Sequence, residues 1–332
     1  MSDKTIAQLG SRYHEFVRAH PHADSAFAAD IEDLLSDAGV TVDRVTARIK
    51  SWPSLKAKAR RRRDDGSRAY PDPWHDVHDI IGVRVNVFHS TEIPVTLDVL
   101  AESFKVHRSV DKAAETRIAG GFGYGSHHMI LEVPEGRSDL AEYVGMQFEV
   151  QVRTVLQHAW AEFEHDVRYK QGGQIDPQVD RAFTLAAGLI ELADQQFDQI
   201  AALKEKETEG DDYVDDVAIT AETLPGILAV LLGNRFPRSR SEHYRWLEEL
   251  LLANGINTVA ELSELLNDSD ISKVFRSMRY RFLPGQVRLI DDLLLLRFRE
   301  EHIERTGNSG NRAEHRPERL KARLNTMRQL GL

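Results

Sequence analysis

The sequence predicts an α+β protein in which strands and helices mix over the first 204 residues and helices alone follow. Residues 148–153, Phe-Glu-Val-Gln-Val-Arg, alternate apolar and polar side chains, which is the period of a strand with one buried face. Residues 79–88 show a similar alternation, with three valines at every second position. From residue 218 to 302 apolar side chains recur at helical spacing, which predicts a mostly helical C-terminal domain.

The bulk composition is that of a globular chain without disulfides. The 332 residues suffice for two modest domains, and 41% hydrophobic with 29% charged residues is an ordinary globular balance. The absence of cysteine excludes disulfides, cysteine-ligated metals and thiol nucleophiles, and it fits a reducing cytosol. The net charge of -10 argues against nucleic-acid affinity over the whole surface, although it leaves room for a local basic channel.

Two further features predict a cytoplasmic protein with no membrane partner. No apolar run approaches the ~20 residues that cross a bilayer. Residues 1–8 lack the charged start and apolar core of a signal peptide. We therefore expect a cytoplasmic location.

The first helices are predicted over residues 5–38, with a break at Pro21 and an end at Gly39. The next stretch, residues 45–58, begins as a short extended piece. It continues as a helix with Pro53 at an early position, which proline tolerates because its missing N–H is not needed there.

Basic side chains line this extended piece and the helix after it. Arg48 and Lys50 are two residues apart and share a face of an extended chain, while Ser54 and Lys58 share a helix face. Together with the helix start, these groups suit a polyphosphate. The alternative is a solvated basic face, which is the interpretation we favour for the following run, Arg60–Arg63.

Asp79 begins the strand over residues 79–88, and Arg84 projects from the face opposite the valines. Mg²⁺ prefers hard oxygen ligands and is commonly held by one or two carboxylates together with phosphates, so Asp79 is a candidate ligand. An isolated aspartate at a strand edge is more often a cap. A helix over residues 93–103 and a short strand over residues 104–110 are predicted to follow.

Tyr124 lies between two glycines on a loop before the strand predicted over residues 127–133. A tyrosine in this setting can stack on a base, or it can be a packed turn residue. His127 and His128 are adjacent and point to opposite faces of the strand, so at most one faces a site. This argues against a metal site with two histidines.

Glu149, Gln151 and Arg153 share the polar face of the strand over residues 148–153. Such a row can hold a metal ion and anionic oxygens, or it can be an ordinary solvated face. An amphipathic helix is predicted over residues 154–170. The side chains expected to be buried along that helix are Val155, Ala159, Trp160, Phe163 and Val167.

The C-terminal half carries no recognised catalytic motif. Residues 183–204 predict a helix packed beside the sheet, which would end the first domain, residues 1–204. The apolar side chains on which this prediction depends are Leu185, Leu189, Leu192, Ala193, Phe197 and Ile200. We expect an acidic linker over 205–217, a helical accessory domain over 218–304 and a basic tail over 305–332 that ends solvated or contacts a partner. The accessory domain is an oligomerisation module or a module that senses a signal and gates the site.

Five short motifs occur in an order that resembles the synthetase domain of the RelA/SpoT alarmone family. They are Arg-Ile-Lys-Ser-x-x-Ser-x-x-x-Lys from residue 48, Asp-Ile-x-Gly-x-Arg from 79, Gly-Tyr-x-Ser-x-His from 123, Glu-Val-Gln-Val-Arg-Thr from 149 and Glu-His-x-x-Arg-Tyr-Lys from 164. The resemblance covers residues 45–170, about two fifths of the chain. The chain resembles a small alarmone synthetase with a C-terminal helical extension, because no His-Asp hydrolase domain precedes the motifs.

The resemblance implies a nucleotidyltransferase-like fold, a mixed sheet flanked by helices. It also implies transfer of the β,γ-pyrophosphoryl group of ATP to the 3′-hydroxyl of GDP or GTP, which makes ppGpp or pppGpp in the stringent response. The implied cofactor is Mg²⁺. Asp79 is similar to the family's magnesium ligand, and Glu149 to its second acidic residue, which holds metal or takes the proton of the attacking hydroxyl.

The remaining roles follow the motifs position by position. Arg48 and Arg84 resemble the pair that sandwiches the adenine of ATP. The residues that resemble contacts to the ATP phosphates are Lys50, Ser54 and Lys58. The residues that resemble the acceptor side are Tyr124, which would stack on guanine, with His128, Gln151 and Arg153 in support.

One departure from the family pattern affects the acceptor. Relatives carry basic residues before the tyrosine and between it and the serine, where this chain has glycine and phenylalanine. Lys112 and Arg117 are nearby cations that would replace the missing positive charge if the loop brings them beside the acceptor. Two alternatives therefore stay open: a toxin that modifies the 3′ CCA end of tRNA, bound through Arg60–Arg63, and an inactive nucleotide-binding regulator. Intact Asp79 and Glu149 argue against the regulator.

Overall fold

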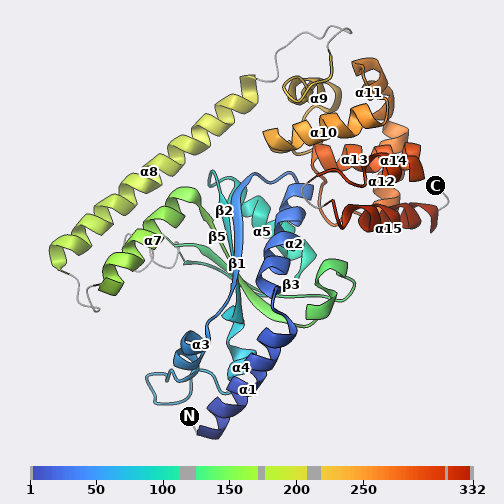
Figure 1. Cartoon of the computed structure of the whole chain (residues 1–332). Helices are drawn as coiled ribbons and strands as arrows, with labels where there is room; N and C mark the ends of the chain where they lie inside the picture. Colours follow the sequence, from blue (N-terminus) through green and yellow to red (C-terminus); the bar gives the residue numbers. More distant parts are fainter. Residues whose placement is uncertain (1–2, 113–124, 171–175, 208–217, 311–312, 330–332) are drawn as a thin grey trace. The chain divides into compact units, whose positions relative to one another are not determined.

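A computed structural model of the chain describes residues 3–112, 125–170, 176–207, 218–310 and 313–329 (Figure 1). The chain divides into two compact units. The first contains Met1–Asp33 and Val42–Asp198, and the second contains Leu34–Thr41 and Gln199–Leu332. Residues 34–41 thus join the second unit, although they lie far from its other residues in the sequence.

The first unit is built on a mixed five-stranded sheet. Its strands are β1 (Val42–Ile49), β2 (Ile81–Val87), β3 (Lys105–Asp111), β4 (His127–Glu132) and β5 (Gln147–Thr154). Their order is β1-β2-β5-β4-β3, with β2 and β5 parallel and the other neighbours antiparallel. The predicted mixed sheet flanked by helices is confirmed.

One face of the sheet is apolar and carries the core of the first unit. Phe148, Val150 and Val152 of β5 are fully buried, as their alternation predicted. The ring of Phe148 packs edge-on against Phe27 of α2 (Ala23–Asp37) and against Phe104, which follows α5 (Glu92–Ser103). α2 and α5 therefore cover this face, and the polar side chains of β5 point to the opposite one.

Helices and 3-10 turns pack around the end of β1. α1 (Asp3–Ala19) packs on α3 (Trp52–Ala59), with the Tyr13 and Trp52 rings 5.6 Å apart between centroids. α4 (Pro73–Asp76) and the 3-10 turn η1 (His78–Ile80) then lead into β2, and a second 3-10 turn, η2 (Ser138–Tyr143), precedes β5. Because α3 begins two residues after Lys50, its N-terminus and Lys50 lie at the same end of β1.

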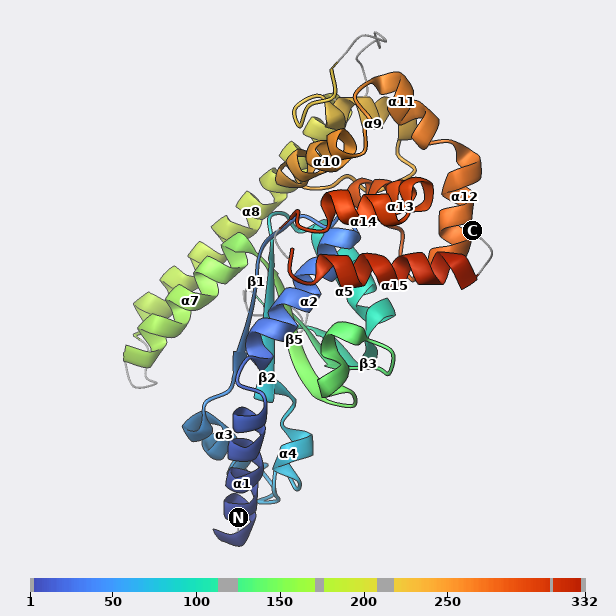
Figure 2. The ribbon, with the colours of Figure 1, turned by 45° about the vertical axis from the view of Figure 1, so that its right-hand side comes forward.

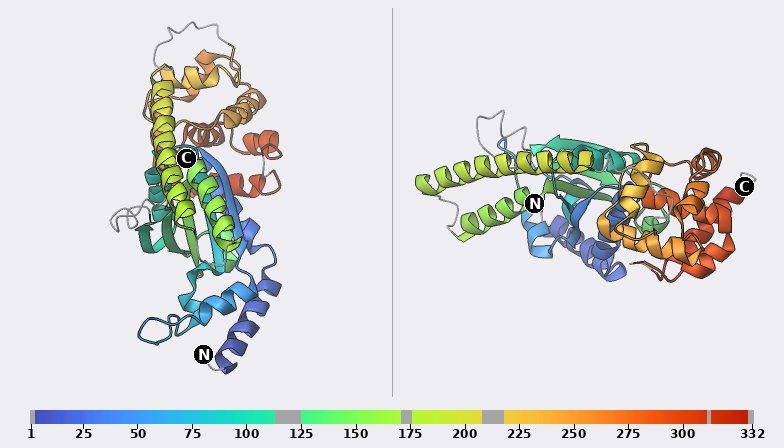
Figure 3. Two further views of the ribbon diagram at one scale, coloured as in Figure 1. Left: turned by 90° about the vertical axis from the view of Figure 1, so that its left-hand side faces the viewer. Right: turned by 90° about the horizontal axis from the view of Figure 1, so that it is seen from above.

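α7 (Val155–Lys170) and α8 (Pro177–Glu207) form a helical hairpin after β5, and Figures 1 and 3 show them side by side. Trp160 of α7 is buried against Phe183 of α8. The buried hydroxyl of Thr154 donates to Oδ2 of Asp194 at 2.9 Å and fixes α8 to the end of β5. Phe163, expected in the buried stripe of α7, is 63% exposed instead, and its ring meets only the edge of α8 at Phe183, 5.8 Å away between centroids.

α8 is the helix predicted over residues 183–204, but its buried side is not the expected one. Phe183 and Ala187 are buried, whereas Leu185, Leu189 and Leu192 are exposed. Helical period identifies an apolar stripe without identifying the neighbour that covers it. The prediction that these leucines pack beside the sheet was therefore wrong.

The second unit is helical, as predicted. Its helices are α9 (Leu224–Leu232), α10 (Ser241–Ala253), α11 (Val259–Leu265), α12 (Asp268–Met278), α13 (Gln286–Phe298), α14 (Glu300–Thr306) and α15 (Arg316–Gln329). α13 is central, because Leu289, Ile290 and Leu294 are fully buried along it. Of the helices described, none is long and apolar enough to cross a membrane.

The basic tail was expected to end solvated or to contact a partner, yet its helix α15 completes the core of the second unit (Figure 2). Leu320, Leu324 and Met327 are buried in that core. The helix begins at Arg316, whose guanidinium binds the buried carboxylate of Asp291 on α13. Packing and a buried ion pair, rather than solvent, therefore fix this basic helix.

Candidate active site

The register of the sheet places the predicted side chains on its polar face. Gly82 of β2 pairs with Arg48 of β1 on one side and with Glu149 of β5 on the other. Because paired residues point to the same face, Arg48 and Glu149 flank a residue that has no side chain. A Cβ at Gly82 would meet no atom within 4 Å, so this part of the face is open. Arg84 and Gln151 form the next pair on the same face, two residues further along β2 and β5.

Asp79 lies in η1, immediately before β2, and is held by two lysines. Nζ of Lys50 donates to Oδ2 at 2.8 Å, and Nζ of Lys58 on α3 lies 3.0 Å from Oδ1. Burial alone would raise the pKa of Asp79, but the amines of Lys50 and Lys58 outweigh it and lower the pKa below its ordinary value. Asp79 is therefore ionised at neutral pH. Each carboxylate oxygen of Asp79 thus faces the amine of one lysine.

Glu149 is held by His128 on the neighbouring strand β4. Nδ1 of His128 lies 2.6 Å from Oε1 of Glu149, and Oγ of Ser126 lies 2.7 Å from Nε2 of the same ring. An ionised carboxylate only accepts hydrogen bonds, so Nδ1 carries the proton and donates it. Burial would raise the pKa of Glu149, but the hydrogen bond and charge of His128 lower it.

His127 points to the other face of β4, as predicted. Its Nε2 lies 2.7 Å from Oγ of Ser109 on β3. His128 is thus the member of this pair that faces the site.

Asp79 and Glu149 lie close enough to influence one another, because the charge of Asp79 opposes ionisation of Glu149. Their carboxylates offer the hard oxygens that Mg²⁺ prefers. In the ranges that the structure covers, no three His, Cys, Asp or Glu side chains gather to hold a metal ion. The donor set therefore fits a cation that takes its remaining ligands from a bound polyphosphate.

Arg48 and Arg84 rise from adjacent strands on the polar face. Arg48 is exposed, whereas Nη1 of Arg84 donates to Oε1 of Glu162 on α7 at 2.7 Å. Sequence reasoning gave Glu162 no role, because the contact joins residues 78 positions apart and helical period places Glu162 outside the buried stripe. α7 therefore contributes a carboxylate to this face of the sheet.

Arg153 is the most buried cation of the predicted site, with 6% of its surface exposed. Its Nη2 donates to Oε1 of Gln151 at 2.6 Å, and its buried Nε has no hydrogen-bond partner among the residues described. Burial lowers the pKa of Arg153, and the positive charge of Arg84 lowers it further. An anion bound at this end of the face would satisfy the free N–H group and relieve the repulsion.

Ser54 and the Arg60–Arg63 run lie at the surface near α3. The hydroxyl of Ser51 donates to Oγ of Ser54 at 2.9 Å. The four arginines are exposed, and Nη1 of Arg62 donates to the carbonyl oxygen of Gly66 at 2.7 Å within the same loop. The predicted solvated basic face is consistent with this exposure.

Part of the predicted acceptor side falls outside the described residues, namely Tyr124 and Arg117. Lys112 is described, and its backbone N–H donates to the carbonyl oxygen of Ser126 at 3.2 Å. The backbone of Lys112 therefore lies beside Ser126, the residue two positions before His128.

Comparison with known proteins extends these observations. Residues 47–174 match the family described as the region found in RelA / SpoT proteins. The GTP pyrophosphokinases YwaC and YjbM of Bacillus subtilis are 26% and 27% identical to the chain over 155 and 164 residues, which cover 47% and 48% of this chain and 71% and 72% of theirs. The uncharacterized protein Rv1366 of Mycobacterium tuberculosis is 30% identical over 178 residues, 51% of this chain and 55% of that one.

Solved structures show similarity of the same kind. Small alarmone synthetase 1 from Bacillus subtilis has a TM-score of 0.48 at 22% identity, over 59% of this chain and 98% of that chain. The same protein bound to its product pppGpp gives 0.47 at 22% identity, over 58% and 97%. The motifs that begin at Arg48, Asp79 and Glu149 all lie within the matched residues 47–174. Residues 47–174, about two fifths of the chain, are therefore a domain that matches the RelA/SpoT family model.

Proposed function

We propose that the chain is an ATP:GTP/GDP 3′-pyrophosphotransferase, a GTP pyrophosphokinase that makes ppGpp or pppGpp. The observation that carries the proposal is the placing of Asp79 and its two lysines beside Glu149 and its histidine on the open face of a RelA/SpoT domain. Moving a charged pyrophosphoryl group requires positioning and charge neutralisation, which these groups supply. The names of YwaC and YjbM support the same reaction.

The donor, ATP, lies along the polar face in this proposal. Lys50 and Lys58 bring positive charge to its phosphates, and the start of α3 adds free N–H groups with the hydroxyl of Ser54. Arg48 and Arg84 hold the adenine between them. Planar guanidinium groups stack on a base, which lysine does not do.

The acceptor is GDP or GTP, with its 3′-hydroxyl directed at Glu149. The hydroxyl oxygen attacks the β-phosphorus of ATP, the bond from that phosphorus to the oxygen bridging the α- and β-phosphorus breaks, and AMP leaves with that oxygen. The hydroxyl proton passes to Glu149, whose lowered pKa keeps the carboxylate ionised at neutral pH. His128 fixes that carboxylate through Nδ1. Tyr124, Gln151 and Arg153 complete the acceptor side, with Tyr124 stacking on guanine.

Mg²⁺ is the proposed cofactor, with Asp79 and Glu149 as its protein ligands. Bound with ATP, it would neutralise charge on the phosphates. We also propose a cytoplasmic location and a role in the stringent response, which the match of residues 47–174 to the RelA/SpoT family model supports.

The proposal is tested by giving the purified chain γ-labelled ATP and Mg²⁺ with GDP, GTP or deacylated tRNA in parallel. We expect label in a guanosine tetra- or pentaphosphate. Asp79→Ala and Glu149→Gln should each reduce this product by about a hundredfold or more, with circular dichroism unchanged. Glu102→Ala, at an exposed position of α5, is the matched control and should keep full activity. Full activity of both site variants would contradict the assignment.

The same reactions separate the alternatives. Label in tRNA alone would favour a tRNA-directed enzyme, for which the exposed Arg60–Arg63 loop offers cations to an RNA backbone. ATP binding without labelled product from any acceptor would favour an inactive regulator.

A further inference from the structure

Both oxygens of the Asp79 carboxylate face an ammonium group. Nζ of Lys50 donates to Oδ2 at 2.8 Å, and Nζ of Lys58 lies 3.0 Å from Oδ1. The three side chains are mostly buried, with 12% of Lys50, 24% of Lys58 and 14% of Asp79 exposed. Because little water screens them, these charges act strongly on one another and on any ion that approaches.

This arrangement opposes a divalent cation at Asp79. Mg²⁺ binds carboxylate oxygens at about 2.0–2.1 Å, so an ion on either oxygen would lie roughly 5 Å or less from an ammonium group. The two lysines carry one positive charge more than Asp79 neutralises, and the exposed Arg48 adds another on the same face. The carboxylate of Glu149 lies nearby, but its Oε1 is 2.6 Å from Nδ1 of His128. Asp79 is therefore a poor metal ligand while both lysines hold it.

A nucleotide polyphosphate changes this balance of charge. It brings several negative charges, and its oxygens accept hydrogen bonds from ammonium groups as a carboxylate does. Lysine has three N–H donors on a flexible four-carbon stem, so each ammonium can turn from Asp79 to a phosphate oxygen while the backbone stays in place. An arginine, with its rigid fork of donors, would instead hold the carboxylate in one bidentate geometry.

The backbone keeps the three residues together while their side chains change partners. The N–H of Lys50 donates to the carbonyl oxygen of Ile80, the residue after Asp79, at 2.8 Å. Lys58 lies on α3, which packs on α1. Asp79 lies in η1, directly before the buried strand β2. The exchange of partners is therefore confined to the lysine side chains.

We propose that Lys50 and Lys58 form a latch on Asp79, which keeps divalent cations off this carboxylate until a polyphosphate draws both ammonium groups away. Metal binding at Asp79 then depends on nucleotide, and by linkage each of the two ligands strengthens the binding of the other. The inference rests on the proposed function in one respect, the placing of the ATP phosphates at these lysines. It adds an order of events, in which the phosphates engage the lysines before metal settles on Asp79.

The test titrates the purified full chain with Mn²⁺ alone and follows free Mn²⁺ by electron paramagnetic resonance. We expect Lys58→Met to bind Mn²⁺ at least about tenfold more tightly than the original chain, because it removes one of two repelling charges. Adding Asp79→Asn to Lys58→Met should abolish this gain, which would place the ion on Asp79. Lys56→Met, on the same helix, is the matched control and should bind Mn²⁺ like the original chain. Circular dichroism checks that each variant is folded.

A second titration measures nucleotide binding with EDTA present, using an ATP analogue with a methylene group between the α- and β-phosphorus. We expect the original chain to bind the analogue, and Lys50→Met and Lys58→Met each to weaken this binding by about tenfold. Lys58→Met should thus act in opposite directions on the two ligands, tightening Mn²⁺ and weakening the analogue. A lysine that only supports the fold would weaken both.

Binding of Mn²⁺ to the original chain as tightly as to Lys58→Met would overturn the proposal, and so would a gain that survives Asp79→Asn. A chain that binds no analogue would contradict the proposed use of ATP. The Mn²⁺ titrations, which contain no nucleotide, would still decide whether the latch exists.

Discussion

At the scale of single residues, we propose that the contact between Arg84 and Glu162 orients the guanidinium for the donor base. Arg84 is the guanidinium that we place against the adenine, and Oε1 of Glu162 accepts its Nη1 hydrogen at 2.7 Å. A flexible arginine stacks on a base only in one plane, and an ion pair at its tip restricts it to that plane. We therefore propose that Glu162 is a positioning residue that acts through Arg84.

A double-mutant cycle tests this role. Arg84→Ala and Glu162→Ala should each raise the KM for ATP by about tenfold while changing kcat much less, because the lost interaction is with the substrate and not with the reacting atoms. The double variant should be no worse than Arg84→Ala alone. Kinetics with ATP varied at saturating acceptor measure these effects, and fully additive losses would show that Glu162 acts independently of Arg84.

The candidate site illustrates what residue patterns predict. The alternation of residues 148–153 and 79–88 placed Glu149 and Arg84 on one face, and the structure brings them together with Asp79 and Lys50. Glu162 could not be predicted, because its partner lies on a strand 78 positions away and no local period records that contact. The pairing of His128 with Glu149 depends in the same way on strand order.

At the scale of elements, Gly39 ends α2 in a conformation that other residues avoid. Its φ is +77°, and a Cβ there would lie 2.7 Å from the carbonyl oxygen of Arg238 and 2.9 Å from Cβ of Pro237. The sequence predicted a glycine terminator at this position, and the structure confirms it. The close approach of the Arg238 segment was not predictable from the sequence.

Gly39→Ala should lower the free energy of unfolding by about 2 kcal/mol or more, because it adds a clash to the left-handed backbone strain. Gly136→Ala is the control, since Gly136 has a φ of +82° and open space around it. It should lose only about 1 kcal/mol from strain. Urea unfolding of the two variants measures the difference, and equal losses would show that the Arg238 segment moves aside freely.

The α8 helix shows where element-level prediction stops. The spacing of Leu185, Leu189 and Leu192 correctly predicted a helix, yet these residues are exposed and Phe183 is buried. The sequence shows apolar side chains on two sides of α8 but does not show which side packs against the rest of the chain. The partner of each stripe is a property of the whole fold.

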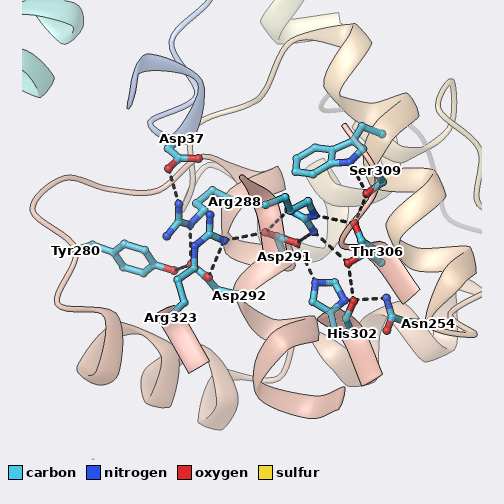
Figure 4. A network of polar contacts seen from close by, with 12 residues as sticks. Asp37, Asn254, Tyr280, Arg288, Asp291, Asp292, His302, Thr306, Ser309 and Arg323 are labelled. Carbon is cyan, nitrogen blue, oxygen red and sulfur yellow. Dashed lines mark hydrogen bonds and ion pairs between the residues drawn. The ribbon is translucent and has the colours of Figure 1, made fainter. Parts of the chain in front are cut away.

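At the scale of the whole molecule, a buried ionic network holds the second unit together. Asp291 on α13 accepts hydrogen bonds from Arg316 and Arg323 of α15, and Nε2 of His302 on α14 lies 3.0 Å from it (Figure 4). Arg288 pairs with Asp37, so the network also includes the last turn of α2. The sequence could not assign residues 34–41 to this unit, because the pairs that do so link distant positions.

Asp291→Asn should destabilise the chain by about 3–5 kcal/mol at neutral pH, because it leaves buried arginines without their carboxylate. Burial would raise the pKa of Asp291, but Arg316, His302 and Arg323 hold the pKa well below its ordinary value. A depressed pKa stabilises the fold above the pKa of an unfolded aspartate, about pH 4, and this stabilisation is lost as the pH falls through the folded value.

The gap in stability between the original chain and Asp291→Asn should therefore stay constant from neutral pH to about pH 4 and shrink below it. Denaturant unfolding at a series of pH values measures the gap. A gap that shrinks already between pH 7 and pH 5 would mean that another group titrates in the network. Asp268→Asn, at an exposed aspartate of α12, is the control and should change stability by less than about 0.5 kcal/mol.

The measurement that most directly tests the proposed function follows the position of the label in ATP. Two reactions with GDP and Mg²⁺ use ATP labelled on either the α- or the γ-phosphate. Pyrophosphoryl transfer predicts γ-label in the guanosine product and α-label in AMP, because the bond between the β-phosphorus and the α,β-bridging oxygen is the one that breaks. Release of the α-label as ADP, with one phosphate transferred or hydrolysed, would contradict it.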